Sequence, residues 1–209
     1  MKIAVFGGTF DPFTVAHRAI VSGLVDMGMD KVIVAPSIVS WHREGKKPWL
    51  SHLEKEFVIR QAVKGIGGRK CSVVPYLDDL RKQYICGDDK TLVERFVTNH
   101  RYIDTLMSII VKEGTEHEYF TVIGTDSFRI FRSWCMWKEI LCFSKLIVVE
   151  GREGVKDEPG GIPAIRMHID ELYSDVSATR VREEYAPKGV GGIIEYVKVF
   201  DEKVKRGEK

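Results

Sequence analysis

Several features that define other classes of protein are missing from this chain of 209 residues. No apolar run approaches the roughly 20 residues needed to span a bilayer, and the short N-terminal one is not typical of a signal peptide. The four cysteines, Cys71, Cys86, Cys135 and Cys142, show no CxxC spacing. They indicate neither a zinc site nor a disulfide framework, so we expect reduced thiols in a cytoplasmic protein without a membrane partner.

A strong excess of charge of either sign is also missing. The chain has 32 Lys and Arg against 30 Asp and Glu, for a net charge of +2, so bulk electrostatics do not indicate a nucleic-acid partner. Hydrophobic residues make up 44% and charged residues 30%, which is typical of globular proteins. This length predicts a single domain over 1–209 with a sizeable core.

Two common phosphate-binding motifs are absent as well. The chain has no GxxxxGK[ST] motif, which disfavours a P-loop NTPase. No GxGxxG pattern follows its first apolar segment, which disfavours an NAD-dependent dehydrogenase.

Short apolar segments alternate with segments of helical periodicity along most of the chain. We expect strands at 2–6, 31–35, 71–74, 119–123, 145–149 and 163–169. We expect helices at 16–28, 51–63, 102–112, 137–143, 179–186 and 190–204. This alternation predicts an α/β fold with a doubly wound, mainly parallel, Rossmann-like sheet, which binds ligands beyond the carboxyl ends of its strands.

Residues 7–17, GGTFDPFTVAH, directly follow the first expected strand. Gly7 and Gly8 allow a tight turn and a close approach of backbone to a ligand. Thr14 and His17 share one face of the first helical turn, so backbone N–H groups, a hydroxyl and an imidazole converge on one point that suits a phosphate. The alternative is a Thr-capped strand-to-helix turn with a surface histidine.

This segment resembles the GGTFDPxHxGH signature of the nucleotidyltransferases that carry an HxGH or TxGH motif. Among them it is most similar to the nicotinate/nicotinamide mononucleotide adenylyltransferases. Thr14 stands where that subfamily usually has His, as in phosphopantetheine adenylyltransferases, and Ala16 replaces the usual Gly. These departures bear on the substrate and the rate more than on the class of reaction.

Residues 175–182, DVSATRVR, resemble the ISSTxIR motif of the same family. A helix start with hydroxyl side chains suits phosphate oxygens, and Arg182 can share the face of Thr179. The resemblance implies that Ser177, Thr179 and Arg182 hold the β- and γ-phosphates of ATP. The alternative is an ordinary helix cap with a solvated arginine.

Residues 123–140, which begin IGTDS, resemble the IGADS…F…W…EI segment of the mononucleotide adenylyltransferases. By this resemblance Gly124 and Asp126 lie against the adenosine, and Trp134 stacks on the pyridine ring of the acceptor. Core packing is the alternative for Trp134.

Two further segments resemble acceptor-binding parts of that subfamily. His42 and Arg43 end a loop similar to one that usually ends in PHK, and Tyr102 and Thr105 belong to a YIDTL segment similar to YTxDTL. A basic surface loop and a buried helix face are the alternatives. Residues 78–100 match least well. We expect there a surface excursion, or a segment that caps the acceptor pocket or forms a contact in a homo-oligomer.

The resemblance implies transfer of AMP from ATP to nicotinate or nicotinamide mononucleotide, with release of pyrophosphate, in NAD biosynthesis. His17, Thr14 and Arg182 are the implied catalytic residues. The implied ATP-binding residues are Gly8, Thr9, Phe10, His17, Gly124, Asp126, Ser177, Thr179 and Arg182. Mg²⁺ is expected to bind through phosphates, with no protein ligands. The alternatives are another phosphorylated acceptor, such as phosphopantetheine, and a non-catalytic nucleotide-binding module.

Overall fold

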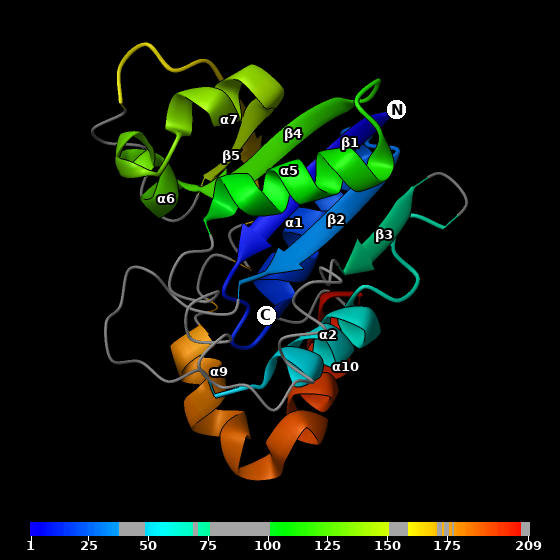
Figure 1. The fold of residues 1–209 in the computed structure, drawn as a ribbon. Coiled ribbons are helices and arrows are strands. Elements are labelled where there is room, and N and C mark those ends of the chain that lie inside the picture. The colour runs from blue at the N-terminus through cyan, green and yellow to red at the C-terminus, as the bar shows by residue number, and fades with distance from the viewer. Residues whose placement is uncertain are drawn as a thin grey trace, which may run out of the picture.

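A computed structural model describes residues 1–37, 49–68, 71–75, 101–150, 159–170, 173, 176 and 178–205. Its centre is a sheet of six strands, all parallel, in the order β3-β2-β1-β4-β5-β6 (Figure 1). The strands are β1 (Lys2–Gly8), β2 (Lys31–Pro36), β3 (Ser72–Pro75), β4 (Glu118–Gly124), β5 (Lys145–Glu150) and β6 (Ala164–His168). The expected doubly wound α/β fold is confirmed.

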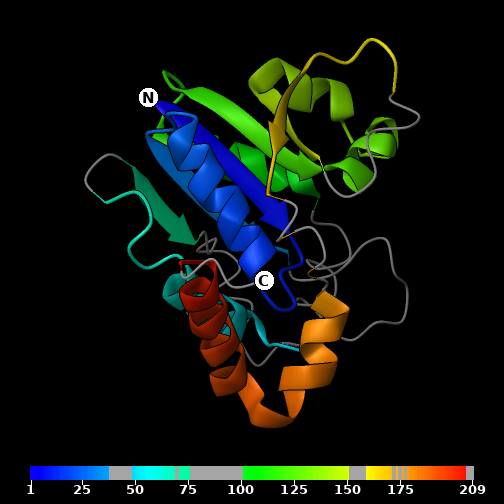
Figure 2. The same ribbon diagram turned by 180° about the vertical axis from the view of Figure 1, so that it is seen from behind.

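Helices cover both faces of the sheet. They are α1 (Val15–Asp26), α2 (His52–Ala62), α5 (Tyr102–Glu113), α6 (Thr125–Arg129), α7 (Trp137–Phe143), α9 (Ala178–Tyr185) and α10 (Gly189–Lys205). Figure 1 shows α5 in front of the sheet, and the reverse view in Figure 2 shows α1 on the opposite face. Side chains alternate along β1 to serve both layers: Ala4 and Phe6 pack with α1, whereas Ile3 and Val5 pack with α5.

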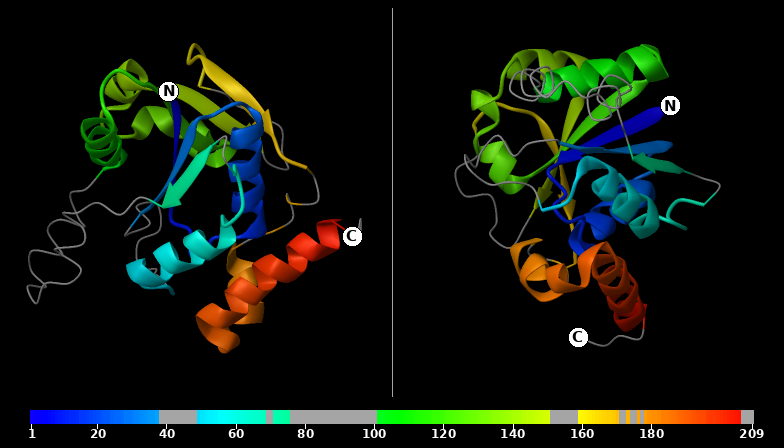
Figure 3. Two further views of the ribbon diagram at one scale, coloured as in Figure 1. Left: turned by 90° about the vertical axis from the view of Figure 1, so that its right-hand side faces the viewer. Right: turned by 60° about the horizontal axis from the view of Figure 1, so that its bottom comes forward.

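The strand order reverses between β1 and β4, because β1 leads to β2 and β3 on one side while β4, β5 and β6 extend the other. In doubly wound sheets this reversal opens a crevice beyond the carboxyl ends of the strands. Helices α2, α9 and α10 lie toward that end of the sheet (Figures 1 and 3). The residues that follow β1 lie next to α9, because Arg182 of α9 contacts Asp11.

Local signals account for the helix starts. At α2 the Ser51 N–H donates to the Glu54 carboxylate at 2.7 Å and the Glu54 N–H donates to Ser51 Oγ at 3.3 Å, which confirms the expected capping box. At α5 the Asp104 carboxylate accepts the Arg101 N–H at 2.6 Å. The inner face of α5 is then buried through Ile103, Leu106, Ile109 and Ile110.

The short helix α6 and the 3₁₀ turn η1 (Phe131–Ser133) were not expected from the sequence. They are three to five residues long, so they are too short to show a helical period. The expected excursion at 78–100 lies outside the described residues. No helix in the described ranges has the length and apolar character needed to cross a bilayer.

Candidate functional site

The last two residues of β1 are positions where only glycine fits. A Cβ on Gly7 would lie 2.8 Å from Tyr102 Cε2, and a Cβ on Gly8 would lie 2.8 Å from Phe10 Cε1. These distances are shorter than packed carbon atoms tolerate. We call residues 7–14 the signature loop. The expectation that these glycines end the strand in a tight turn is wrong, because both belong to β1 and pair with Ala35 and Pro36 of β2. Close packing of aromatic rings explains them instead.

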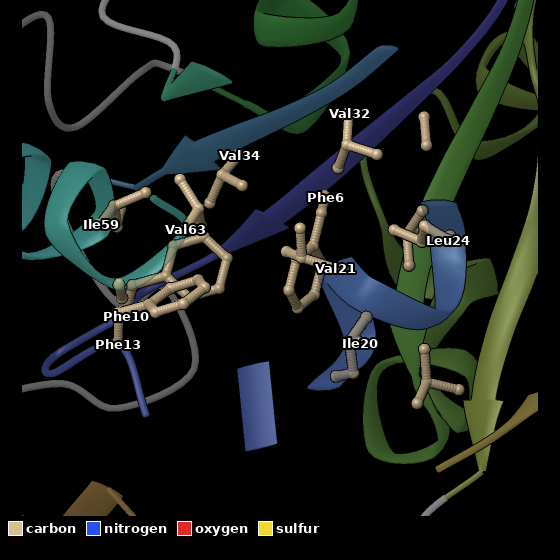
Figure 4. Packing of buried hydrophobic residues seen from close by; sticks show 14 of the residues in the cluster. Phe6, Phe10, Phe13, Ile20, Val21, Leu24, Val32, Val34, Ile59 and Val63 are labelled. Atoms are coloured by element: carbon tan, nitrogen blue, oxygen red, sulfur yellow. The ribbon is translucent and has the colours of Figure 1, made fainter. Parts of the chain in front are cut away.

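The loop is held by buried aromatic side chains (Figure 4). Phe10 has a φ of +45°, a left-handed conformation that costs a non-glycine residue roughly 1–2 kcal/mol. Its ring is nevertheless buried, with centroids 5.0 Å from Phe6 and 5.4 Å from Phe13. Burial of such rings offsets the strain. The expected role of the Phe10 N–H in phosphate binding remains a prediction.

His17 lies in the first turn of α1, and its hydrogen bonds select one tautomer. The Thr14 N–H donates to His17 Nδ1 at 2.9 Å, so a neutral ring carries its proton on Nε2. The ring centroids of Phe10 and Phe13 lie 5.1 and 5.3 Å from that of His17. This burial lowers the pKa of His17 from 6.5 to about 4. His17 is thus a neutral N–H donor at neutral pH.

Thr14 is buried and acts on His17 twice. Besides the backbone contact, its hydroxyl lies 3.0 Å from His17 Nδ1. The expectation that Thr14 and His17 share one face is confirmed by these contacts. The hydroxyl already has an imidazole partner, so its proposed contact with phosphate would require it to turn away from Nδ1.

Arg182 joins the second signature to the first. On α9 its guanidinium donates to Thr179 Oγ1 at 3.1 Å and to the carbonyl oxygen of Asp11 in the signature loop. Its Nη1 also lies 4.0 Å from the Asp11 carboxylate. Residues 171 positions apart are thereby brought to one place, which the sequence motifs alone could only suggest. Ser177 lies outside the described residues.

Tyr102 and Trp134 meet beside the end of β1. Their ring centroids are 5.3 Å apart at 53°, and Trp134 also packs 5.4 Å from Phe131. The Tyr102 hydroxyl lies 3.2 Å from Thr121 Oγ1 and 3.4 Å from the Val5 carbonyl, and burial raises its pKa. Trp134 Nε1 is buried with no hydrogen-bond partner among the described residues.

The two acceptor-site candidates on α5 differ in their surroundings. Thr105 is buried on the inner face of the helix, whereas Tyr102 is only partly buried. Tyr102 with Trp134 therefore forms an aromatic wall that also belongs to the core. The other acceptor candidates, His42 and Arg43, lie outside the described residues.

Gly124 and Asp126 lie across the strand-order reversal from the signature loop. Gly124 ends β4, is exposed, and has open space where a Cβ would be. Asp126 is fully exposed on α6, and Thr125 Oγ1 donates to the Val149 carbonyl at 3.1 Å, which fixes α6 to the end of β5. This exposed edge leaves room for a ligand next to β4.

Sequence reasoning assigned no role to Asp11, in the signature loop, or to Lys55, beside it. The Asp11 carboxylate accepts the backbone N–H groups of Trp49 and Leu50 at 2.9 and 2.8 Å. Lys55, on α2, is 1% exposed. Asp11 stands inside the first signature, which was a usable signal, whereas a lysine among helical polar residues reads as solvated. Among the described residues, no group of three or more His, Cys, Asp or Glu could ligate a metal directly.

Comparison with known proteins agrees with this geometry. The chain is 27% identical over 201 residues to the probable nicotinate-nucleotide adenylyltransferase of Fusobacterium nucleatum, covering 93% of each. It is 26% identical over 197 residues to the protein of the same description from Pseudomonas aeruginosa, covering 94% of this chain and 78% of that one.

A solved structure shows the same fold. It is the Plasmodium falciparum nicotinic acid mononucleotide adenylyltransferase complexed with NaAD, which superposes with a TM-score of 0.62 at 14% identity, covering 87% of this chain and 82% of that one. The family model described as Cytidylyltransferase-like matches residues 5–184, a range that contains the signature loop, His17 and Arg182. The chain belongs to the cytidylyltransferase-like family of nucleotidyltransferases.

Proposed function

We propose that this protein transfers AMP from ATP to nicotinate mononucleotide, releasing pyrophosphate and forming the dinucleotide precursor of NAD. The observation that carries the proposal is the contact between the two signatures, through which Arg182 and Thr179 lie beside the loop that leads to His17. The names of the relatives above support the choice of acceptor.

The reaction needs no protein nucleophile, because a phosphate oxygen of the acceptor attacks the α-phosphorus of ATP. A new oxygen–phosphorus bond forms there, and the bond from the α-phosphorus to the bridging oxygen of pyrophosphate breaks. The protein must align the two substrates and stabilise the charge that develops on the phosphates. Mg²⁺ bound to phosphate oxygens would supply positive charge. The site fits an ion carried by the phosphates, because the described residues offer donors to phosphate oxygens and no cluster that could ligate a metal directly.

The proposed roles follow from the described contacts. His17 donates its Nε2–H to an α- or β-phosphate oxygen, while Thr14 fixes the ring in the required tautomer. The backbone of Gly8, Thr9 and Phe10 lines the phosphates. Arg182 and Thr179 hold the β- and γ-phosphates, as the resemblance implies.

We assign the remaining substrate contacts to residues that end or follow β4 and to Tyr102 beside the end of β1. Gly124 and Asp126 border the adenosine, and the Tyr102–Trp134 pair borders the pyridine ring. Trp134 Nε1, buried without a partner among the described residues, gives this wall an unused donor. Thr105, His42 and Arg43 remain predicted acceptor contacts.

Parallel initial-rate assays with ATP and Mg²⁺ test the proposal against the alternatives. The acceptors are nicotinate mononucleotide, nicotinamide mononucleotide and phosphopantetheine. We expect dinucleotide formation with the nicotinate substrate and none with phosphopantetheine. Turnover of phosphopantetheine alone would instead support the other phosphorylated acceptor, which Thr14 favours because phosphopantetheine adenylyltransferases have Thr at this position. ATP binding without turnover of any acceptor would make this a nucleotide-binding module, as Ala16 would suggest.

A further inference from the structure

Lys55 is a buried cation to which the proposed reaction assigns no role. It lies in the second turn of α2, 1% exposed, and its Nζ donates to the Ser37 carbonyl at 3.4 Å. Burial lowers the pKa of Lys55, and the negative charge of Asp11 acts in the opposite direction. An ammonium that is withdrawn from water costs several kcal/mol unless nearby groups compensate its charge. The Ser37 carbonyl and the negative charge of Asp11 therefore compensate the buried charge of Lys55.

Asp11 and Lys55 hold two backbone segments: a leading flank at Ser37, after β2, and a trailing flank at Trp49 and Leu50, before α2. On the leading flank, the Ser37 carbonyl accepts the Lys55 hydrogen bond and the Ser37 N–H donates to the Gly8 carbonyl at 2.8 Å. On the trailing flank, the N–H groups of Trp49 and Leu50 donate to the Asp11 carboxylate. Both flanks are thus tied to the signature loop or to the lysine beside it.

The trailing flank is also covalently continuous with the helix that carries Lys55. Leu50 is followed by Ser51, the N-cap of α2, and the Lys55 N–H donates to the Ser51 carbonyl at 2.9 Å. On its other side Asp11 faces Arg182, whose Nη1 lies 4.0 Å from its carboxylate. Asp11 is therefore set between a cation from α2 and a cation from α9.

We propose that Lys55 and Asp11 are positioning residues that fix the backbone of Ser37 and of Trp49–Leu50 against the phosphate-binding signature loop, and so hold the acceptor in register with ATP. Neither residue needs to touch a substrate. This inference rests on the proposed function, because the predicted acceptor contacts His42 and Arg43 follow β2 in the sequence. It assigns a reason for a buried charge where an apolar side chain would pack more easily.

The first test measures acceptor affinity separately from ATP affinity. Lys55→Met keeps the length of the side chain and removes its charge and donor. We expect the KM for nicotinate mononucleotide to rise about tenfold while the KM for ATP changes less than about threefold. The reason is that the charged hydrogen bond from Lys55 to the Ser37 carbonyl is lost, and Ser37 lies on the side where nicotinate mononucleotide is expected. Lys55→Arg should restore most of the affinity. Lys64→Met, at an exposed lysine just beyond α2, is the matched control.

The second test does not depend on activity. In Asp11→Asn, an NH2 group replaces one carboxylate oxygen, and this group cannot accept the backbone N–H that it faces. Amide hydrogen exchange at Trp49 and Leu50 should accelerate by about tenfold or more, while exchange in the core strand β4 stays unchanged. Unchanged exchange at both amides would refute the tether even if the wild-type protein turned over no acceptor.

The outcomes separate this inference from the proposed function. A wild type that is inactive on nicotinate mononucleotide would refute the function, whereas the exchange measurement would still decide the tether. A folded Lys55→Met protein with equal changes in both KM values, or with none, would overturn the positioning role. If Lys55→Met fails to fold, Lys55→Gln, which keeps a neutral donor, is measured in its place with the same criteria.

Discussion

His17 takes its chemical form from its neighbours. The Thr14 N–H and hydroxyl both face Nδ1, and the surrounding phenylalanine rings disfavour the charged imidazolium. A neutral donor with a fixed tautomer needs no proton rearrangement when a phosphate arrives, which is the property that electrostatic preorganisation requires.

Removal of this donor should therefore affect turnover more than folding. In His17→Ala, we expect kcat to fall on the order of a hundredfold or more, as is typical when one donor to a transition state is lost. Steady-state kinetics with circular dichroism as the folding control provides the measurement. A variant with near-normal kcat would remove His17 from the catalytic residues.

The lowered pKa of His17 also predicts how stability depends on pH. Because the folded pKa of about 4 lies below the unfolded value of 6.5, the unfolded chain binds more protons between these values. Stability is thus lost as pH falls from 6.5 toward 4. From pH 7 to pH 5, His17 should contribute a loss of about 2 kcal/mol in the free energy of unfolding.

Denaturant unfolding of the wild type and of His17→Gln at both pH values isolates this contribution. The loss between pH 7 and pH 5 should be smaller in the variant by that amount. Equal losses in the two proteins would show that His17 titrates normally in the folded state.

At the scale of elements, β1, β4, α5 and α7 are joined by a chain of hydroxyl groups. Ser144 Oγ donates to the Ile140 carbonyl at 2.9 Å, Thr121 Oγ1 lies 2.6 Å from Ser144 Oγ, and the Tyr102 hydroxyl lies 3.2 Å from Thr121 Oγ1. Each hydroxyl can donate to the next, so all of them are satisfied. The chain fixes the ring of Tyr102 over Gly7.

A methyl group at Gly7 should disturb this junction. Because the Tyr102 ring is held at its hydroxyl and by Trp134, Gly7→Ala should destabilise the protein by roughly 1–3 kcal/mol, as overpacking does. Gly191→Ala in α10, where a Cβ meets open space, should instead stabilise it by up to about 1 kcal/mol. Thermal unfolding of both variants is the measurement. A Gly7→Ala protein as stable as the wild type would mean that the Tyr102 ring is free to move.

Trp134 at the same junction should separate the two substrates. If its ring stacks on the acceptor, Trp134→Ala should raise the KM for nicotinate mononucleotide about five- to tenfold, consistent with a stacking contribution of roughly 1 kcal/mol and some lost burial. The KM for ATP should change little. Equal effects on both substrates would assign Trp134 to the core alone, where Phe131 and Tyr102 already contact it.

Sequence patterns predicted the elements well because most of them have strong local causes. The buried strands are apolar runs, and Ser51 with Glu54 forms the expected capping box. Helix α6 was missed because five residues cannot show a helical period. The burial of Lys55 depends on its contact with Ser37 and on the charge of Asp11, both distant in sequence. The contact of Arg182 with the signature loop also joins distant segments, so neither feature is encoded locally.

For the whole molecule, the strand order explains why distant motifs meet. Because β1 and β4 are neighbours at this reversal, the signature loop and Gly124 leave the same edge of the sheet (Figure 1). Helix α9 contacts the loop through Arg182. Cytoplasmic location, a homo-oligomeric state and the role of residues 78–100 remain predictions from the sequence.

The most direct test of the central claim follows the phosphorus atoms of ATP. The protein is incubated with Mg²⁺, nicotinate mononucleotide and ATP carrying a radiolabel on either the α- or the γ-phosphorus. We expect all consumed α-label to appear in the dinucleotide and all consumed γ-label in pyrophosphate, in equal amounts. Label from the γ-phosphorus in inorganic phosphate, or no α-label in a dinucleotide, would contradict adenylyl transfer.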